Sequence, residues 1–333
     1  MNRRYPFFIS FLTGLLVLFF CGPLAAKTIT FKFSNFVPPI EAHAKAGVWI
    51  EKELNETAGD KVKAKYFHSG QMGGPPDIVK KTQMGVLQGA WLIGNIAPDF
   101  NSKFAIGTLA YLMDSYEKWN AFLENDALRE ELFSSLEPKG LKVLDLCYFG
   151  KYGITSTKPA RTLNDLKKMK LRTTKGKYPL AFWNAIDVNP TPMSWGDVIP
   201  ALNQKVIDGT DQTMGVVYLL KVDDLCKYFT RTNHMIGLHF FVVNNKWYKK
   251  LDPEVSEVIA ASVHKNFKKA REMAMELTAK AEAELPKKGV EIIDFSKEDL
   301  NALKEAQKTV WKKFETEIGK EWLDKVSNFV SGM

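Results

Sequence analysis

The chain has 333 residues, enough for two domains of ordinary size. Its hydrophobic fraction of 45% and charged fraction of 25% are those of an average soluble globular protein, which excludes disordered and fibrous chains. The formal net charge of +8 raises the local concentration of acidic ligands but specifies no fold.

Residues 1–26 have the pattern of a secretory signal peptide. Arg3 and Arg4 precede an apolar run over 7–20, and small residues follow before the polar chain. An uncleaved membrane anchor is the alternative, but the apolar helix is shorter than the ~20 residues that a bilayer span needs. We therefore expect cleavage near Ala26 and a periplasmic protein.

Strand and helix patterns alternate through the first half of the chain. Residues 28–36 have an apolar side chain at every second position, the period of a half-buried strand, and 42–54 has a helical pattern. The rhythm predicts an α/β fold with a substantially parallel sheet, because parallel strands need crossover helices. The remaining expected elements here are a strand over 61–67, a loop over 68–76, a helix over 77–89 and a strand over 89–94.

A second alternating set begins after Gly150, with no low-complexity linker before it. Two domains are therefore expected to be joined by strands and helices that cross between them, as in a hinge. The expected strands are 152–157, 170–174, 206–212 and part of 234–248, with a loop or short strand over 188–193. The expected helices are 163–169, 178–186 and 194–204.

A long helix is predicted from Asp252 to Leu285. Asp252 is a capping residue, Pro253 suits the first helical position, and neither proline nor glycine interrupts the pattern that follows. Some 30 residues at 1.5 Å each give a helix of roughly 45–50 Å, longer than one small domain. We therefore predict that this helix spans both domains. Residues 297–329 are again helical and amphipathic.

Signatures of enzymes, cofactors and nucleic-acid binding are missing from the sequence. We find no nucleophile elbow and no phosphate loop, and the five histidines show no metal-ligand spacing. The lysines are scattered along helical stretches without a nucleic-acid motif. We expect no catalytic residues, no metal, no cofactor and no nucleic-acid partner. Cys147 and Cys226 could pair in an oxidising compartment, but a buried free thiol is the favoured interpretation for Cys147.

A few polar and aromatic residues could line an interdomain cleft. Arg172 ends the strand-like segment 168–172, where it could hold a carboxylate through two parallel hydrogen bonds. A surface arginine beside four lysines is the alternative. Trp195, Trp91 and Tyr152 could line the cleft as well, although aromatic residues near strands are often core residues.

Longer stretches resemble a known family. Residues 156–172 and 189–212 look like the signature region of substrate-binding proteins of tripartite ATP-independent periplasmic (TRAP) transporters, of the DctP-like type. Residues 31–90 and 244–259 agree with that family too. The resemblance implies a two-domain periplasmic binding protein fold (type II-like), with mixed sheets flanked by helices and a long helix behind both domains. We assign 27–149 plus about 237–280 to domain I, and 150–236 plus about 281–333 to domain II, with the ligand cleft between them.

The resemblance also implies residue roles. The family's arginine after the strand holds the ligand carboxylate, and Arg172 is in that position. Trp195 would pack against the ligand, Gln212 stands where asparagine is frequent, and Asp211 stands where glutamate is common. The expected ligand-binding set is Arg172, Gln212, Trp195, Tyr152, Asn35, Trp91, Asp211 and Phe36, with Asn35 and Trp91 on the wall of domain I.

One departure from the family bears on the ligand. Many members that bind dicarboxylates or sialic acid carry a second arginine where this chain has Tyr152. An unpaired buried charge costs several kcal/mol, so we predict a monocarboxylate with an apolar or aromatic body. The implied partners are a small and a large membrane subunit driven by an ion gradient, and the protein is expected to be a monomer. A ligand sensor that docks on a receptor, or a binder of dicarboxylates or sugar acids, is the alternative.

Overall fold

The computed structural model describes residues 28–333, and the predicted signal peptide at residues 1–26 lies outside this range. The first sheet has the strand order β2-β1-β3-β9-β4. β1 is parallel to β2 and β3, whereas β9 is antiparallel to its neighbours β3 and β4. The strands are β1 (Ile29–Ser34), β2 (Val62–Phe67), β3 (Gly89–Ile93), β4 (Leu141–Ser156) and β9 (Ile236–Asn244), and helices α1 (Ala42–Thr57) and α2 (Pro75–Gln83) connect β1, β2 and β3.

The burial of these strands follows from their place in the sheet. β2 lies at the edge, and its sequence VKAKYF alternates buried Val62, Ala64 and Tyr66 with exposed lysines. β9 is buried at every residue, because it lies inside the sheet with side chains packed on both faces. The helix predicted over 77–89 ends earlier, at Gln83, and Gly85 takes a positive φ of 77° in the turn that follows.

The second sheet is built around the other end of β4. There β4 is antiparallel to β7 and β8, β5 is parallel to both β6 and β7, and β10 is parallel to β8. The strands are β5 (Leu171–Thr173), β6 (Thr191–Pro192), β7 (Gly209–Thr213), β8 (Tyr228–Arg231) and β10 (Glu291–Asp294). The sequence did not predict β8 and β10. The helices between them are α5 (Leu163–Lys167), α6 (Lys177–Asn184), α7 (Val198–Asn203) and α8 (Met214–Leu219).

β4 therefore belongs to both sheets. It pairs with β9 as far as Lys151 and with β7 from Tyr152 onward. A register shift between Tyr148 and Gly150 marks the crossing, and Gly150 has a φ of +140°. The expected separate strand after Gly150 is instead the continuation of one 16-residue strand. The domain boundary that we placed at 149/150 lies within two residues of this change of partner.

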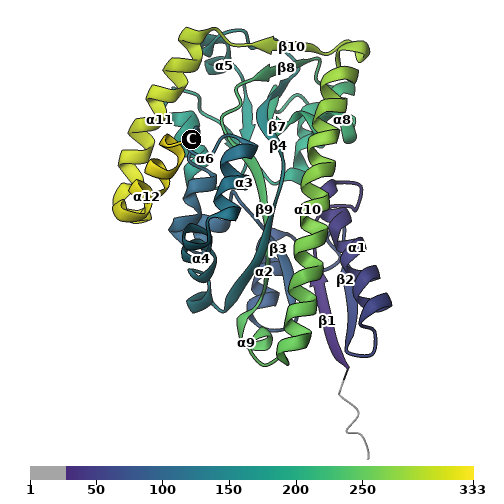
Figure 1. Ribbon diagram of the computed structural model, residues 1–333. Helices are drawn as coiled ribbons and strands as arrows, with labels where there is room; N and C mark the ends of the chain where they lie inside the picture. Colours follow the sequence, from purple (N-terminus) through teal and green to yellow (C-terminus); the bar gives the residue numbers. More distant parts are fainter. Residues whose placement is uncertain (1–27) are drawn as a thin grey trace, which may run out of the picture.

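The predicted long helix is α10 (Pro253–Glu284), 32 residues or about 48 Å in length. It packs against α1 and β4 at one end and against α8 at the other, so it spans both halves of the molecule as expected (Figure 1). Asp252 occupies the position before the helix, but its side chain accepts no capping hydrogen bond there.

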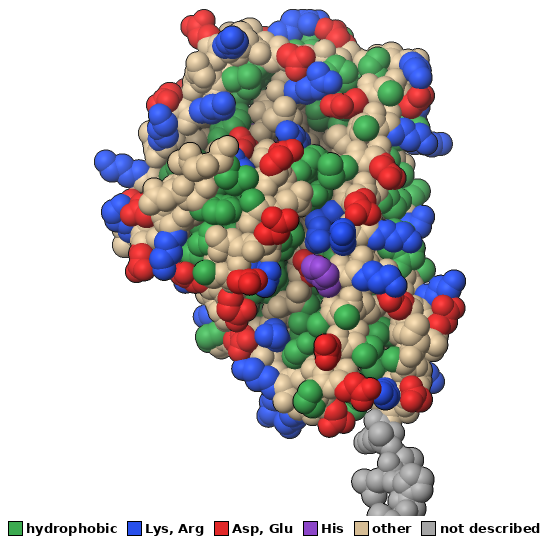
Figure 2. Space-filling view, viewed as in Figure 1, with side chains coloured by type: hydrophobic (Ala, Val, Ile, Leu, Met, Phe, Trp, Pro, Cys, Tyr) green, Lys and Arg blue, Asp and Glu red, His purple; other side chains and the backbone are tan. Residues whose placement is uncertain are grey.

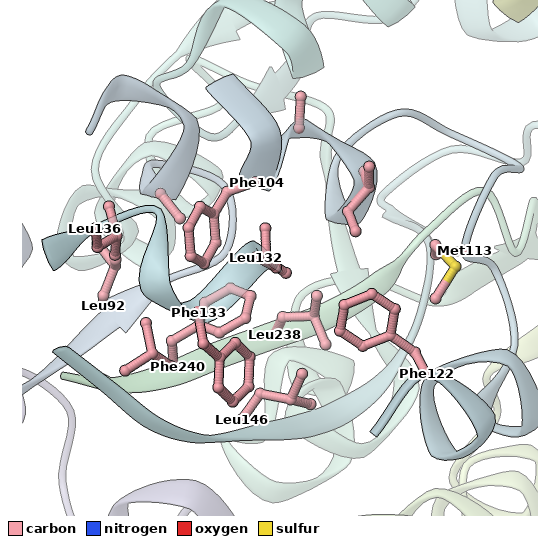
Figure 3. Packing of buried hydrophobic residues seen from close by; sticks show 14 of the residues in the cluster. Leu92, Phe104, Met113, Phe122, Leu132, Phe133, Leu136, Leu146, Leu238 and Phe240 are labelled. Atoms are coloured by element: carbon pink, nitrogen blue, oxygen red, sulfur yellow. The ribbon is translucent and has the colours of Figure 1, made fainter. Parts of the chain in front are cut away.

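Two apolar cores cover the two faces of the first sheet. The side chains of α1 and α10 pack on one face, around Phe33, Trp91 and Phe267. On the other face, β9 and β4 meet the segment between β3 and β4, as Figure 3 shows for Phe104, Phe122, Phe240 and neighbouring residues. That segment, for which the sequence predicted no elements, contains α3 (Tyr116–Glu124), α4 (Asp126–Ser134) and the short helical turns η1 (Ala97–Asp99), η2 (Ser102–Gly107) and η3 (Glu137–Lys139).

The C-terminal helical segment divides at Gly319 into α11 (Lys297–Ile318) and α12 (Lys320–Ser331). Leu303 of α11 packs in the core of the second sheet, whereas Trp322 and Val326 of α12 join the core that faces β9. The end of the chain that we assigned to domain II therefore reaches back to the first sheet. The remaining short elements are α9 (Asn245–Tyr248), η4 (Trp195–Asp197), η5 (Val222–Asp224) and η6 (Pro286–Lys288).

Cys147 and Cys226 are free and buried in different cores, in keeping with the favoured interpretation for Cys147. Within residues 28–333, no helix is long and apolar enough to cross a membrane. On the face shown in Figure 2, basic and acidic side chains are interspersed, so this face presents no continuous basic surface of the kind that binds nucleic acid.

Candidate functional site

The candidate site lies where the carboxyl ends of strands from both sheets meet beside the crossing of β4. In open α/β sheets, ligands bind in the crevice outside the carboxyl ends of the strands. Asn35 follows β1 and Asn95 follows β3 on the side of the first sheet. Arg172 on β5 and Asp211 on the parallel strand β7 lie on the side of the second sheet.

Arg172 is only 3% exposed. Its Nε and Nη2 atoms donate to the carbonyl oxygen of Met193 at 3.0 and 2.6 Å, and Nη1 donates to the Thr210 hydroxyl at 3.4 Å. Burial lowers the pKa of Arg172, but a guanidinium starts so far above neutral pH that it stays charged. A guanidinium has more N–H groups than these three hydrogen bonds use, so the remaining ones can donate to a carboxylate.

Asp211 is the nearby acid. Its Oδ1 lies 3.6 Å from Arg172 Nη1, which is an ion pair without a direct hydrogen bond. Its Oδ2 accepts from the Thr173 hydroxyl at 2.6 Å and from Trp183 Nε1 at 3.4 Å. Burial raises the pKa of Asp211, while the charge of Arg172 acts in the opposite direction. The two side chains thus form a buried pair of opposite charges.

Aromatic residues surround this pair. The Arg172 guanidinium lies 5.7 Å from the centre of the Trp195 ring, in the geometry of a cation–π contact. Tyr152 is buried, and its ring centre is 6.0 Å from that of His234. Burial raises the pKa of Tyr152, and the charges of Asp211 and Arg172 act on the same hydroxyl. The structure thus brings Arg172, Asp211, Trp195 and Tyr152 together.

Of three further predicted residues, Gln212 adjoins this cluster, and Asn35 and Phe36 lie after β1 on the side of the first sheet. Gln212 is buried beside Asp211, and its Oε1 accepts from the Thr213 backbone N–H at 2.8 Å. Asn35 is buried, and its Oδ1 accepts from Val37 N at 3.3 Å, whereas its Nδ2 has no hydrogen-bond partner among residues 28–333. Phe36 is half-buried with its ring 6.0 Å from that of His239.

Trp91 is placed elsewhere. Its ring is fully buried in the core between β3 and α10, 4.9 Å from Phe241 and 5.8 Å from Phe267. The alternative of a core residue therefore describes this tryptophan, because β3 points it toward the helices behind the sheet. We do not propose Trp91 as a ligand contact.

The sequence did not identify several buried polar residues around the cleft. They are Glu41, His43, Asn95, His234 and His239. The histidines carry no recognisable spacing, because they come from α1, the loop before β9 and β9 itself. These residues can be recognised only in the structure, from the burial of several polar side chains in one region of the fold.

The cleft is narrow next to Asp211. The crevice there has no room for a water molecule, and it is lined by Thr108, Ala110, Pro179, Phe182, Trp183, Asp211, His234 and Met235. Within residues 28–333, no group of three or more His, Cys, Asp or Glu side chains is placed to hold a metal ion.

A family model, bacterial extracellular solute-binding protein family 7 (DctP), matches residues 33–317. The chain belongs to this family. The family 7 protein is 27% identical over 305 residues to the C4-dicarboxylate-binding periplasmic protein DctP of Vibrio cholerae, with 89% of each chain covered.

Solved structures share the fold of this family 7 protein. The sugar acid binding protein of Advenella mimigardefordensis in complex with galactonate has a TM-score of 0.86 at 20% identity, covering 92% of this chain and 99% of that one. A TRAP periplasmic solute binding protein of Ralstonia eutropha with bound 2-acetolactate has a TM-score of 0.85 at 21% identity, covering 91% and 99%. The likeness confirms the predicted two-domain binding-protein fold. TRAP solute-binding proteins are periplasmic transport proteins, not enzymes; they bind small organic anions and work with membrane permease subunits.

Proposed function

We propose that this protein captures a small monocarboxylate with an apolar or aromatic body and delivers it to the small and large membrane subunits of a TRAP transporter. The observation that carries the proposal is Arg172, a buried guanidinium at the carboxyl end of β5 with N–H groups to spare and an aromatic ring beside it. A carboxylate in this position gains charge-assisted hydrogen bonds in a poorly solvated site.

The proposal of a ligand with a single carboxylate rests on the number of buried arginines that could bind one. Among residues 28–333, the buried arginines are Arg172 and Arg271. Arg271 is engaged behind the first sheet, where its Nη1 donates to the Leu146 carbonyl oxygen at 2.6 Å and to Asp145 at 3.3 Å. A second carboxylate in the cleft would therefore be buried without a guanidinium, which costs several kcal/mol.

The aromatic residues around the cleft support an apolar or aromatic body for the ligand. Phe149 lies 6.1 Å from Tyr152 between ring centres, and Phe182 and Trp183 flank His234 at 4.9 and 5.4 Å. Small-molecule sites are mostly apolar with a few well-placed polar groups, and this arrangement has that character.

Capture by hinge closure follows from the architecture. β4 and α10 run between the two halves, and a ligand held by Arg172 gains contacts with the first sheet only when the halves close. Such a ligand shifts the population toward the closed state by the free energy of those additional contacts.

A thermal-shift screen of the purified protein against mono- and dicarboxylates tests this function. A ligand at about 100 times its dissociation constant adds ~2.7 kcal/mol of stability. We expect aromatic or branched monocarboxylates to raise the melting temperature. A response to dicarboxylates or sugar acids alone, the ligand classes named for the relatives, would keep the transport role and exclude the monocarboxylate. No response to any acid would contradict the proposal.

Replacing Arg172 tests the assigned role directly. Arg172→Ala should weaken binding of the identified acid by about 2–5 kcal/mol, because it breaks a buried charge interaction. The matched control is Arg161→Ala, since Arg161 is exposed and pairs with Glu291 at the surface. Arg172→Ala also leaves Asp211 without its cation, so the double variant Arg172→Gln, Asp211→Asn separates a folding defect from a binding defect. Unchanged affinity in both Arg172 variants would exclude Arg172 as the carboxylate anchor.

A further inference from the structure

Three polar residues that the proposed carboxylate subsite does not use lie on the side of the first sheet, where two of them are in ring contact with Phe149. Glu41 directly precedes α1, His43 lies in its first turn, and His239 lies on β9. We call these three residues the acceptor cluster. They are buried, with 5%, 1% and 3% of their surface exposed, and the rings of His43 and His239 stack with centres 4.0 Å apart.

The acceptor cluster lacks hydrogen-bond partners. Within the described residues, Glu41 Oε1, both ring nitrogens of His43 and Nδ1 of His239 make no hydrogen bond. Glu41 Oε2 is 3.8 Å from His43 Nε2, too far for a hydrogen bond. Buried polar groups in folded proteins are nearly always paired, because an unpaired one costs free energy. Four unpaired atoms in one cluster therefore need a partner that residues 28–333 do not supply.

Burial also fixes the charge of the acceptor cluster. It lowers the pKa of His43 to about 3 and holds the pKa of His239 well below its usual range, so both imidazoles are neutral at neutral pH. A neutral imidazole offers one ring nitrogen as an acceptor and the other as an N–H donor, so His43 presents one of each. Burial raises the pKa of Glu41 to about 7, and its carboxyl group accepts hydrogen bonds in either protonation state. The cluster thus offers the Glu41 oxygens and one nitrogen of each imidazole as acceptors, beside the imidazole N–H donors, and it holds no positive charge for a second carboxylate.

Aromatic contacts connect the acceptor cluster to the carboxylate subsite. The Phe149 ring lies 5.3 Å from that of His43 and 6.1 Å from that of Tyr152. The charges of Asp211, Arg172 and, more weakly, Glu41 all act on the Tyr152 hydroxyl. A ligand anchored at Arg172 that extends past Tyr152 therefore meets Glu41 and the two stacked imidazoles.

We propose that the acceptor cluster binds a hydrogen-bond donor of the ligand, a hydroxyl or an ammonium group, so that this protein selects hydroxy or amino monocarboxylates over plain acids of the same size. The inference rests on the proposed function, because Arg172 anchors the carboxylate. It adds selectivity, since a plain acid leaves the buried acceptors unpaired in the closed cleft. A site built to pair with such a group discriminates strongly against the analogue that lacks it.

Two matched series of probes test this selectivity by calorimetry. The aromatic series is hydrocinnamate, phenyllactate and phenylalanine, and the branched series is isovalerate, hydroxyisovalerate and valine. In at least one series, the hydroxy or amino member should bind at least about tenfold more tightly than the plain acid. The plain acid should still depend on Arg172.

Variants of Glu41 test whether the donor group of the ligand is a hydroxyl or an ammonium group. Glu41→Gln keeps an acceptor oxygen but cannot be charged, so it should retain a preference for the hydroxyl and lose one for the ammonium group. Glu41→Leu should reduce both preferences, because it removes one of the acceptors of the cluster. Glu56→Gln on the exposed side of α1 is the matched control and should change neither. If Glu41→Leu does not fold, His239→Phe keeps the ring stack, removes the Nδ1 acceptor and should reduce the preference as well.

The possible failures are distinguishable. If both plain and donor-bearing acids bind equally and depend on Arg172, the acceptor cluster has no role in selection and the proposed function stands. If the preference is as strong in Glu41→Leu and His239→Phe as in the parent protein, the donor group of the ligand binds outside the acceptor cluster and the inference is wrong. If no member of either series binds, the monocarboxylate function fails and this inference fails with it.

Discussion

Arg172 and Asp211 carry opposite charges, so an incoming carboxylate has to share the guanidinium with a resident acid. The sequence pointed to both residues, because an arginine at a strand end and a family pattern are local signals. The acceptor cluster gave no such signal, since His43 and His239 are far apart in the chain and meet only when β9 takes its place in the sheet. Trp91 was predicted as a ligand contact but lies in the core, because the sequence does not tell which face of β3 its side chain occupies.

Three buried neutral histidines give the folded state an acid sensitivity. Burial lowers the pKa of His43 and of His234 to about 3 and holds the pKa of His239 low. Below about pH 6.5 the unfolded chain binds protons at these residues and the folded protein does not, so stability falls as the pH falls. The melting temperature should therefore decrease from pH 6.5 to pH 4.5.

Glu41 acts against this trend. Its pKa is about 7 in the folded protein and 4.5 as the ordinary value, so the folded state holds a proton that the unfolded chain releases between these values. That contribution to stability grows as the pH falls from 7. Glu41→Gln removes it, so the acid-side loss should become steeper than in the parent protein and in Glu56→Gln. Identical pH profiles for all three proteins would contradict the assigned burial of Glu41.

At the scale of elements, the sequence predicted helices and strands with an uninterrupted apolar pattern better than those interrupted by glycine. The long helix α10 was predictable because no glycine or proline follows Pro253 in its 32 residues. The sequence predicts a new strand after Gly150, yet β4 continues through this position with a register shift between Tyr148 and Gly150. The helices between β3 and β4 were missed, and their apolar residues serve a core shared with distant strands.

The crossing of β4 depends on Gly150. Its φ of +140° is a conformation that side chains rarely adopt, and an added Cβ would lie 2.8 Å from the Cβ of Thr213. Gly150→Ala should destabilise the protein by about 1–3 kcal/mol through backbone strain, with the clash added to it. Gly196→Ala is the control, because nothing lies within 4 Å of its added Cβ. Equal denaturation midpoints for the two variants would show that the crossing tolerates the side chain.

At the scale of the molecule, the family and the two-domain fold were predictable from extended sequence similarity, and the ligand was not. Ligand choice depends on a few side chains whose contacts arise only in the tertiary structure. The domain limits remain a proposal, and α12 shows why the sequence alone is insufficient. This helix follows domain II in the chain and packs against η2 near the first sheet.

The predicted monomeric state is supported by the distribution of hydrophobic residues over the surface. Among residues 28–333, the large exposed hydrophobic residues are spread over several parts of the chain, and they are Ile40, Val48, Met84, Val86, Val206, Met275 and Met333. A stable interface needs about 800 Å² from each partner, with an apolar centre. Light scattering should therefore give the mass of one chain at micromolar concentration, and twice that mass would contradict the prediction.

The position of β9 between β3 and β4 limits when the first sheet can fold. A chain that emerges N-terminus first presents β1, β2, β3 and β4 long before the strand that joins β3 to β4 exists. Until residue 244 is available, the early segments have unpaired strand edges and no complete core. Pairings over such sequence distances form slowly. The topology thus keeps the emerging chain unfolded for longer than a simple meander would, a delay that suits a polypeptide threaded through a membrane before it folds.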